Sequence, residues 1–167
     1  EIVVEAGKAP PLRSIIDTDS PEFYAGGDME QKIRDYCART GQPVPETVGG
    51  IARCIYESLA LKYRHAIEGL ERMKGERIDS MNIVGGGIQN KLLCQMAADA
   101  AGRPVITGPI EGAAMGNLLT QAMALGDLAG VDELREVVRN SVEVETYTPN
   151  RTPEWERAYE KLLGFIK

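Results

Sequence analysis

Histidine and clustered cysteines are scarce in this sequence of 167 residues. The single histidine, His65, lies beside a helical apolar stripe, and we interpret it as a surface or boundary residue rather than a catalytic one. The three cysteines, Cys37, Cys54 and Cys94, are far apart. A structural zinc site needs about four clustered ligands, so we assign no metal-binding residue. Isolated thiols in helical patterns are typical of buried side chains in a reducing compartment, which predicts a cytoplasmic protein.

Long apolar runs and basic patches are also lacking. No stretch approaches the ~20 apolar residues of a membrane-spanning helix, so we expect no membrane segment. The net charge is −6, and lysine and arginine are scattered among acidic residues. Nucleic-acid binding needs clustered cations, so we expect no nucleic-acid partner. The first residues contain neither a secretory leader nor an initiator methionine, which favours a piece of a longer protein.

The composition supports one folded domain, because 43% of the residues are hydrophobic. Residues 1–20 show no regular period, and their prolines mark turns. A short helix is expected at 29–40, with Asp28 as its N-cap. The longest helix is expected at 48–73, where apolar residues recur at helical spacing, namely Ile51, Cys54, Ile55, Leu59, Ala66, Ile67, Leu70 and Met73.

The second half of the chain alternates strand and helix patterns. Residues 78–84 and 104–107 predict two short strands, each followed by a helix. The inward residues expected on these helices are Leu92, Leu93, Met96, Ala97 and Ala100, and then Met115, Leu118, Leu119, Ala122 and Met123. Such a βαβα unit implies a parallel strand pair and an α/β fold class. Because two parallel strands are few, further strands are expected in the amino-terminal stretch or outside this chain.

Three more elements are expected near the end of the chain. A short helix is predicted at 132–139, and an edge strand at 142–147. Thr152 is expected to cap a last helix that begins at Pro153. The apolar face of this helix should contain Trp155, Tyr159, Leu162 and Ile166.

Three consecutive glycines, Gly85, Gly86 and Gly87, follow the first predicted strand. A direct turn from strand to helix needs a positive φ, which glycine adopts without a Cβ clash. The missing side chains would also let a base or phosphate approach the main chain near a helix N-terminus. Asn90 can cap that helix or donate an amide hydrogen bond to a ligand. The residues alone leave open a nucleotide loop or a tight connection without a ligand.

Neither common nucleotide fingerprint is complete here. A Rossmann motif reads GxGxxG with an acidic residue about 20 positions later, but the third position is Asn90 and Glu111 lies too far along. A Walker A loop needs GxxxxGK[ST], and no such string occurs. A different kind of nucleotide site is therefore required.

A second motif extends from Gly108 to Asn117. Glu111 places a negative charge near a helix N-terminus. Gly116 costs ~1 kcal/mol relative to alanine inside a helix, which indicates a packing or ligand reason for it. Small residues such as Ala114 favour close helix packing beneath the glycine turn over direct ligand contact.

Together these motifs closely resemble the carboxy-terminal part of the FGGY carbohydrate kinases. The matching blocks run in order through Ile83 to Asn90, Leu92-Leu93, Gln95 to Ala100, Gly102 to Val105, Gly108 to Glu111 and Gly116-Asn117. Upstream blocks are similar to the members that phosphorylate L-rhamnulose, namely Ala9 to Asp17, Gly41 to Thr47 and Glu57 to Tyr63. The resemblance covers nearly the whole chain.

The resemblance implies a helix-rich α/β fold with few parallel strands, part of the actin-like, ribonuclease H-like second domain of sugar kinases. Residues 1–167 would form the carboxy-terminal part of that domain. Residues 1–47 would be lead-in loops and a short helix, and residues 48–167 the nucleotide-binding βαβα core with the terminal helix.

The resemblance also implies which residues meet the nucleotide. The glycine turn Gly85 to Gly87 matches the family turn that lies against the adenosine of ATP, and Asn90 matches the amide that reaches the nucleotide. The family's catalytic aspartate, the general base for the sugar hydroxyl, has no match here. We therefore assign no catalytic residue, and we interpret the acidic residues Asp17, Asp19 and Glu111 as structural.

The implied function is ATP-dependent phosphorylation of L-rhamnulose or a related ketose. ATP or ADP and Mg²⁺ would bind fully only in the complete enzyme, whose amino-terminal domain would hold the sugar, so this piece alone is expected to be inactive. Two alternatives remain, a non-catalytic regulatory or assembly module with the same fold and, less favoured, a dinucleotide-dependent oxidoreductase. Exposed sheet edges would also promote self-association.

Overall fold

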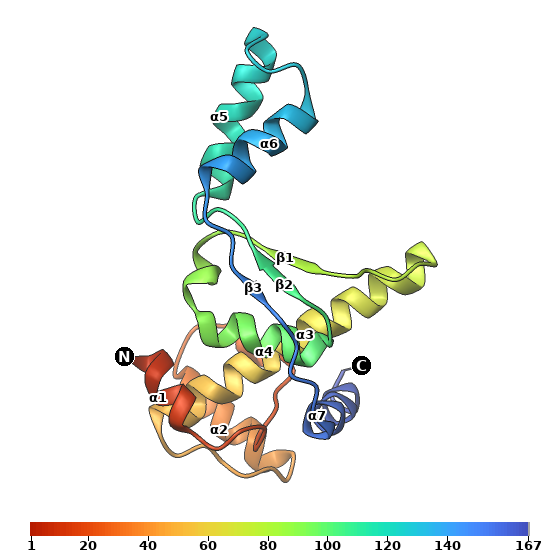
Figure 1. Ribbon diagram of the computed structural model, residues 1–167. Coiled ribbons are helices and arrows are strands. Elements are labelled where there is room, and N and C mark those ends of the chain that lie inside the picture. Colours follow the sequence, from red (N-terminus) through yellow and green to blue (C-terminus); the bar gives the residue numbers. More distant parts are fainter. Residues whose placement is uncertain (167) are drawn as a thin grey trace.

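The structure is a computed structural model that describes residues 1–166. In Figure 1, a small sheet lies between a large group of helices and a separate helical pair, α5 and α6. The elements in chain order are α1 (Ile2–Lys8), the short 3-10 helix η1 (Pro21–Phe23), α2 (Met29–Arg39), α3 (Val48–Lys74), β1 (Met81–Ile83), the 3-10 helix η2 (Gly86–Gln89), α4 (Lys91–Ala101), β2 (Val105–Thr107), α5 (Gly112–Leu125), α6 (Val131–Ser141), β3 (Thr146–Tyr147) and α7 (Pro153–Leu163).

The sheet has the order β1-β2-β3 within the described residues. Strands β1 and β2 are parallel, with Met81 opposite Val105 and Ile83 opposite Thr107. Strand β3 is antiparallel to β2, with Tyr147 opposite Val105. The predicted parallel pair and edge strand are therefore confirmed, although each strand is shorter than its sequence pattern.

The main core lies where α3, α4 and α7 pack together against β2. Its fully buried side chains include Leu61 of α3, Cys94 of α4, Val105 of β2 and Leu162 of α7. A smaller cluster joins α2 to the first half of α3 and contains Cys37 and Cys54. All three cysteines are buried free thiols, as predicted.

Local hydrogen bonds set where several helices begin. The Asp28 carboxylate accepts from the backbone N–H of Gln31 at 3.0 Å, which confirms its predicted role as N-cap of α2. Thr47 caps α3 in the same way through the N–H of Gly50. Thr152 stands at the N-cap position of α7 as predicted, but its side chain makes no capping hydrogen bond in the described part of the chain.

One helix was not expected from the sequence. Residues 1–20 were predicted to lack regular structure, yet Ile2–Lys8 forms α1. This helix is too short to be stable alone, and it forms because it packs against α3, where Ala6 is fully buried. Tertiary contact decides this segment, and a short apolar pattern could not reveal it.

Two predicted apolar faces are not buried. At the end of α3, Leu70 is 50% exposed and Met73 is 79% exposed, because no described element packs over this end. On α5, Leu118 is 67% exposed, and none of the helix's side chains is buried by the rest of residues 1–166. Periodicity predicted which side chains share a face, but it could not predict whether another element covers that face.

The close packing expected around Gly116 is also absent. A Cβ atom at Gly116 would meet no other atom of residues 1–166 within 4 Å, apart from its own helix. Helix α5 contacts mainly α6, and Figure 1 shows both standing apart from the other helices. Among residues 1–166, no helix has the length and apolarity needed to cross a membrane.

Candidate functional site

The glycine turn, residues Gly85 to Gly87, follows β1 directly. Gly85 has φ +85° and ψ −171°, a backbone conformation that side-chain-bearing residues rarely adopt. Its N–H donates to the carbonyl of Pro109 at 3.0 Å, and the N–H of Ile88 donates back to the Gly85 carbonyl at 3.3 Å. The turn is therefore attached on one side to the segment that follows β2.

The sequence suggested that the glycines lead directly into an α-helix, but they do not. A 3-10 turn, η2, intervenes, and α4 begins only at Lys91. Asn90 caps α4, because its Oδ1 accepts from the N–H of Leu93 at 3.1 Å. The carbonyl of Asn90 accepts from the N–H of Cys94 at 3.1 Å, and that cysteine is fully buried. The first contact holds the Asn90 side chain, and the second holds its main chain, at the end of the turn.

The outer face of the turn is open. Cβ atoms built on Gly86 or Gly87 would meet no atom of residues 1–166 within 4 Å. The amide nitrogen of Asn90 has no hydrogen-bond partner in the same part of the chain, since only its oxygen is used for capping. The four predicted nucleotide-binding residues thus lie within one short segment, residues 85–90, with exposed glycines at 86 and 87 and a free amide donor at Asn90.

The second motif lies beside the first. The N–H of Gly108 donates to the carbonyl of Ile83 at 2.8 Å, which continues the parallel pairing by one residue beyond β2. Glu111 is exposed at the N-cap position of α5, where its charge was predicted to lie. Both motifs therefore meet at the carboxyl ends of the parallel strands. This is the end of the sheet where ligands bind in open α/β folds.

A cavity of about 520 Å³ lies next to the turn at this edge. Its lining is mostly apolar and comes from η2, the segment after β2, α5 and the approach to β3, with Ile88, Pro109, Ile110, Met115 and Val142 as apolar members. The carboxylates of Glu111, Glu143 and Glu145 and the ammonium of Lys91 also line it. The three glycines are not among the lining residues, so this cavity adjoins the glycine turn without including it.

Charged groups at this cavity tie α4 to β3. The ammonium of Lys91 donates to the carboxylate of Glu145, and this bond, with a second from the Tyr147 hydroxyl, holds the pKa of Glu145 below its usual value. Burial, followed by the nearby Glu145 carboxylate, raises the pKa of Tyr147. The side chain of Thr107 donates to the backbone carbonyl of Glu145 and accepts from its N–H.

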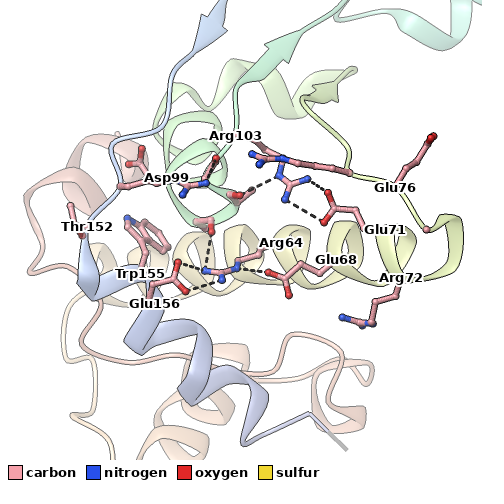
Figure 2. A pocket seen from close by; sticks show the side chains of 16 residues that line it. Arg64, Glu68, Glu71, Arg72, Glu76, Asp99, Arg103, Thr152, Trp155 and Glu156 are labelled. Atoms are coloured by element: carbon pink, nitrogen blue, oxygen red, sulfur yellow. Dashed lines mark hydrogen bonds and ion pairs between the residues drawn. The ribbon is translucent and has the colours of Figure 1, made fainter.

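A larger cavity of about 770 Å³ lies near the amino ends of the parallel strands, between the end of α4, the second half of α3 and the start of α7. Figure 2 shows that arginines and carboxylates line it in pairs. Arg103 binds Glu71 at 2.6 Å, and Arg64 binds Glu68 at 2.8 Å. Arg64, Arg103 and Arg151 also donate to the carbonyls of Ala100, Ala101 and Gly102, where α4 ends.

These arginines act as a cationic cap for α4. Cations at a helix C-terminus are favourable because they satisfy its free carbonyls and oppose its dipole. Since the buried guanidinium groups of this cavity are used by the helix end and by neighbouring carboxylates, they do not indicate a ligand. Sequence reasoning missed this cluster, because Arg64 lies on α3 whereas Arg103 lies in the turn between α4 and β2, far from it in sequence.

The remaining candidate residues have structural partners. Asp17 and Asp19 both pair with Lys62 of α3, at 3.1 and 2.7 Å. His65 is half-buried, and its Nδ1 lies 3.4 Å from the hydroxyl of Tyr159. Within residues 1–166, no group of three or more histidine, cysteine, aspartate or glutamate side chains is arranged to hold a metal ion. The structural interpretation of these residues therefore agrees with their contacts.

Comparison with known families and proteins gives consistent matches. Residues 4–125 match the C-terminal domain of the FGGY family of carbohydrate kinases. A rhamnulokinase from Bacteroides thetaiotaomicron is 44% identical over 159 residues, which is 95% of this chain and 33% of that protein. A rhamnulokinase from Klebsiella pneumoniae subsp. pneumoniae is 42% identical over 149 residues, covering 89% of this chain and 30% of that protein. The chain thus spans about a third of the length of these curated relatives.

Solved structures agree on the fold. A xylulose kinase from Rhodospirillum rubrum superimposes with a TM-score of 0.65 at 21% identity, covering 98% of this chain and 32% of that one. A glycerol kinase from Plasmodium falciparum with ADP gives a TM-score of 0.63 at 15% identity, covering 99% of this chain and 34% of that one. The expected fold class, part of a sugar-kinase domain with few parallel strands, is confirmed by these similarities.

Proposed function

The chain belongs to the FGGY family of carbohydrate kinases, and on this premise we propose that it is the adenosine-side part of an ATP-dependent kinase for L-rhamnulose or a related ketose. The curated relatives at 42% and 44% identity are rhamnulokinases, which supports the choice of sugar. Residues 48–167 would be the nucleotide-binding core, and residues 1–47 would lead into it. The proposed protein is cytoplasmic, in keeping with its three free buried thiols.

The open main chain at Gly86 and Gly87 is the observation that carries the nucleotide proposal. A flat adenine or ribose can approach this surface because no Cβ atom intervenes. The free amide nitrogen of Asn90, at the end of the same turn, can donate to an acceptor on the nucleoside. Gly85, Gly86, Gly87 and Asn90 are thus the proposed ATP- or ADP-binding residues.

In this proposal the chain binds and orients the nucleotide and supplies none of the reacting side chains. ATP carries the phosphoryl group to the sugar hydroxyl, and Mg²⁺ neutralises charge on its phosphates when bound. Mg²⁺ at such sites is usually held by one or two carboxylates together with the substrate phosphates. In this proposal the magnesium ligands, the general base and the sugar contacts lie in the remaining length that the relatives have, and we expect no kinase activity from this chain alone.

The proposed activity is tested with the full-length protein of which this chain would be part. Purified enzyme with ATP and Mg²⁺ is offered a panel of ketoses, and ADP release is measured. We expect release with L-rhamnulose or a close relative. Absence of ADP release with every ketose would refute the kinase assignment.

The proposed nucleotide site is tested with the 167-residue chain. Titration with ADP, followed by nuclear magnetic resonance, should shift the backbone amides of Gly85 to Gly87 and the side-chain amide of Asn90. Tighter binding of NADH than of ADP would instead support a dinucleotide-dependent oxidoreductase. A chain that binds neither ligand would support a regulatory or assembly module.

Self-association is proposed through β1, which lies at an edge of the sheet in the described residues. An edge strand offers unpaired backbone groups to a second copy. Analytical ultracentrifugation should detect a dimer whose population increases with concentration. A monomer at every concentration would contradict this proposal.

A further inference from the structure

The segment that follows β2 holds the glycine turn in place. Ile83 lies opposite Thr107 in the parallel pair, so Val84 lies opposite Gly108 one position further on. Backbone hydrogen bonds flank this position, from Gly108 N–H to the Ile83 carbonyl and from Gly85 N–H to the Pro109 carbonyl. Val84 is the one residue between Ile83, where β1 ends, and Gly85, where the glycine turn begins.

Gly108 leaves no room for a side chain. A Cβ atom at this position would lie 2.6 Å from Cγ1 of Val84, a distance that real Cβ atoms essentially never show. The φ of Gly108 is not in the left-handed region, so its backbone conformation is open to alanine. The need for glycine at position 108 is thus steric, and it arises from one methyl group of Val84.

Gly112 provides a direct comparison on the other side of the same valine. A Cβ atom there would lie 3.5 Å from the Cβ of Val84, which is ordinary van der Waals contact. Gly112 is the first residue of α5 and also lacks a left-handed φ. Alanine at 112 should therefore be accepted, whereas alanine at 108 must displace Val84.

A displacement of the Val84 main chain would move the turn. Val84 is covalently adjacent to Gly85, and β-branched side chains have few χ1 rotamers through which to escape a clash. Moving Val84 away from Gly108 would lengthen the bond from Gly85 N–H to the Pro109 carbonyl, now 3.0 Å. The open face at Gly86 and Gly87 would then shift relative to Asn90, which α4 holds separately.

We propose that Gly108 is a positioning residue for the nucleotide, acting through Val84 to place the glycine turn. This inference rests on the proposed function, because it concerns the same nucleotide site. Gly108 lines the neighbouring cavity, and in this proposal it acts through its contact with Val84 and makes no contact with the nucleotide.

The experiment compares Gly108→Ala, Val84→Ala, the double variant and Gly112→Ala in the full-length protein of which this chain would be part. ADP affinity is measured by titration, and exchange of the Gly85 amide hydrogen is measured by mass spectrometry. Gly108→Ala should weaken ADP binding roughly tenfold, because small displacements of positioned groups cost affinity and rate steeply. It should also speed exchange at Gly85.

Rescue traces the loss to the contact with Val84. Truncating Val84 removes the methyl group that the new Cβ would meet, so the double variant should recover both wild-type ADP affinity and slow Gly85 exchange. Gly112→Ala should resemble wild type in both measurements, and Val84→Ala is the reference for the double variant. Recovery in the double variant would trace the loss to the Val84 methyl group. Weakened ADP binding by Gly108→Ala with an unchanged urea-unfolding midpoint would separate positioning from general destabilisation.

The outcomes also separate this inference from the proposed function. If wild type fails to bind ADP, the nucleotide site is refuted, and Gly108 can no longer position a nucleotide. If wild type binds ADP but Gly108→Ala binds equally well, or the double variant shows no recovery, the positioning role is overturned while the nucleotide site stands.

Discussion

The guanidinium of Arg64 donates to both carboxylate oxygens of Glu156, at 3.0 and 2.8 Å, across 92 positions of the sequence. The same guanidinium lies 4.0 Å from the ring centre of Tyr159. Because Arg64 belongs to α3 and both partners belong to α7, these contacts fasten the carboxy-terminal helix to the longest helix of the fold. Figure 2 shows the pairing of Arg64 with Glu156.

The Arg64–Glu156 pair predicts a pH dependence of stability. Its hydrogen bond to Arg64 holds the pKa of Glu156 below the ordinary value of 4.5. A carboxylate whose pKa is lower in the folded state stabilises the fold at pH values above its pKa in the unfolded state. This contribution is lost as the pH falls through the folded-state pKa. Glu156→Gln should therefore remove part of the loss of stability below about pH 4.5, by less than about 1 kcal/mol because the carboxylate is exposed.

Urea unfolding followed by circular dichroism at neutral and acidic pH measures this effect. Glu160→Gln is the control, because Glu160 is an exposed carboxylate on the same helix. An equal change in both variants would show that the Arg64 contact contributes nothing specific.

A buried carboxylate governs the loop before α2. Glu57 is 1% exposed, and its two oxygens accept from Arg53 at 2.7 Å and from the backbone N–H of Leu12 at 2.9 Å. Leu12 has φ +52°, which is unfavourable for leucine, so this hydrogen bond holds a strained residue in place. Glu57→Gln replaces one acceptor by a donor and should cost about 3 kcal/mol in unfolding free energy.

The contribution of Glu57 to stability should depend on pH with the opposite sign to that of Glu156. Burial raises its pKa above 4.5, although the bonds from Arg53 and Leu12 oppose the rise. Between the unfolded and folded pKa values the folded state holds more protons, so stability falls as pH rises through that interval. Glu57→Gln should lack this fall. An unchanged pH profile would show that Glu57 does not titrate in this interval.

Two leucines test the difference between covered and uncovered helix faces. Leu61 is fully buried in the main core, and Leu118 on α5 is 67% exposed. Leu61→Ala should cost about 2–5 kcal/mol, because it removes buried methyl groups and leaves a cavity. Leu118→Ala should change the unfolding free energy by less than about 0.5 kcal/mol. A comparable loss in both variants, measured by urea unfolding, would mean that α5 is covered in solution.

Asn90 has two separable tasks, capping α4 and donating to the proposed nucleotide. Asn90→Asp keeps an oxygen for the Leu93 N–H, so stability should stay within about 0.5 kcal/mol of wild type. Asn90→Ala removes the cap and should cost about 1 kcal/mol. Both variants lack the amide donor, so both should bind ADP more weakly. Undiminished ADP binding by Asn90→Asp would exclude the donor role.

Local sequence patterns predicted the parts of the fold that local chemistry decides. The caps at Asp28 and Asn90 and the burial of Leu162 depend on residues close together in sequence or on a helical period. The parallel strand pair followed from the alternation of strand and helix patterns along the chain. For the same reason the glycine turn could be located before its geometry was known.

Long-range contacts decided the rest. Helix α1 forms because α3 provides a surface for Ala6, and the exposure of Leu118 depends on what lies beyond the helix. The contact between Val84 and the Gly108 position was missed, although a glycine at the end of one strand and a β-branched residue at the end of its neighbour gave a signal. Strand register, which sets that contact, could not be assigned from two such short patterns.

Trp155 is the only tryptophan in the sequence, and it is 8% exposed at the start of α7, beside the arginine cap of α4. Its indole belongs to the main hydrophobic core. An indole in apolar surroundings emits light at shorter wavelengths than one surrounded by water. Any event that releases α7 from α3 and α4 should therefore move the emission of the whole protein toward the red. The chain thus carries an intrinsic optical reporter for the docking of its carboxy-terminal helix, and no added dye is needed to follow it.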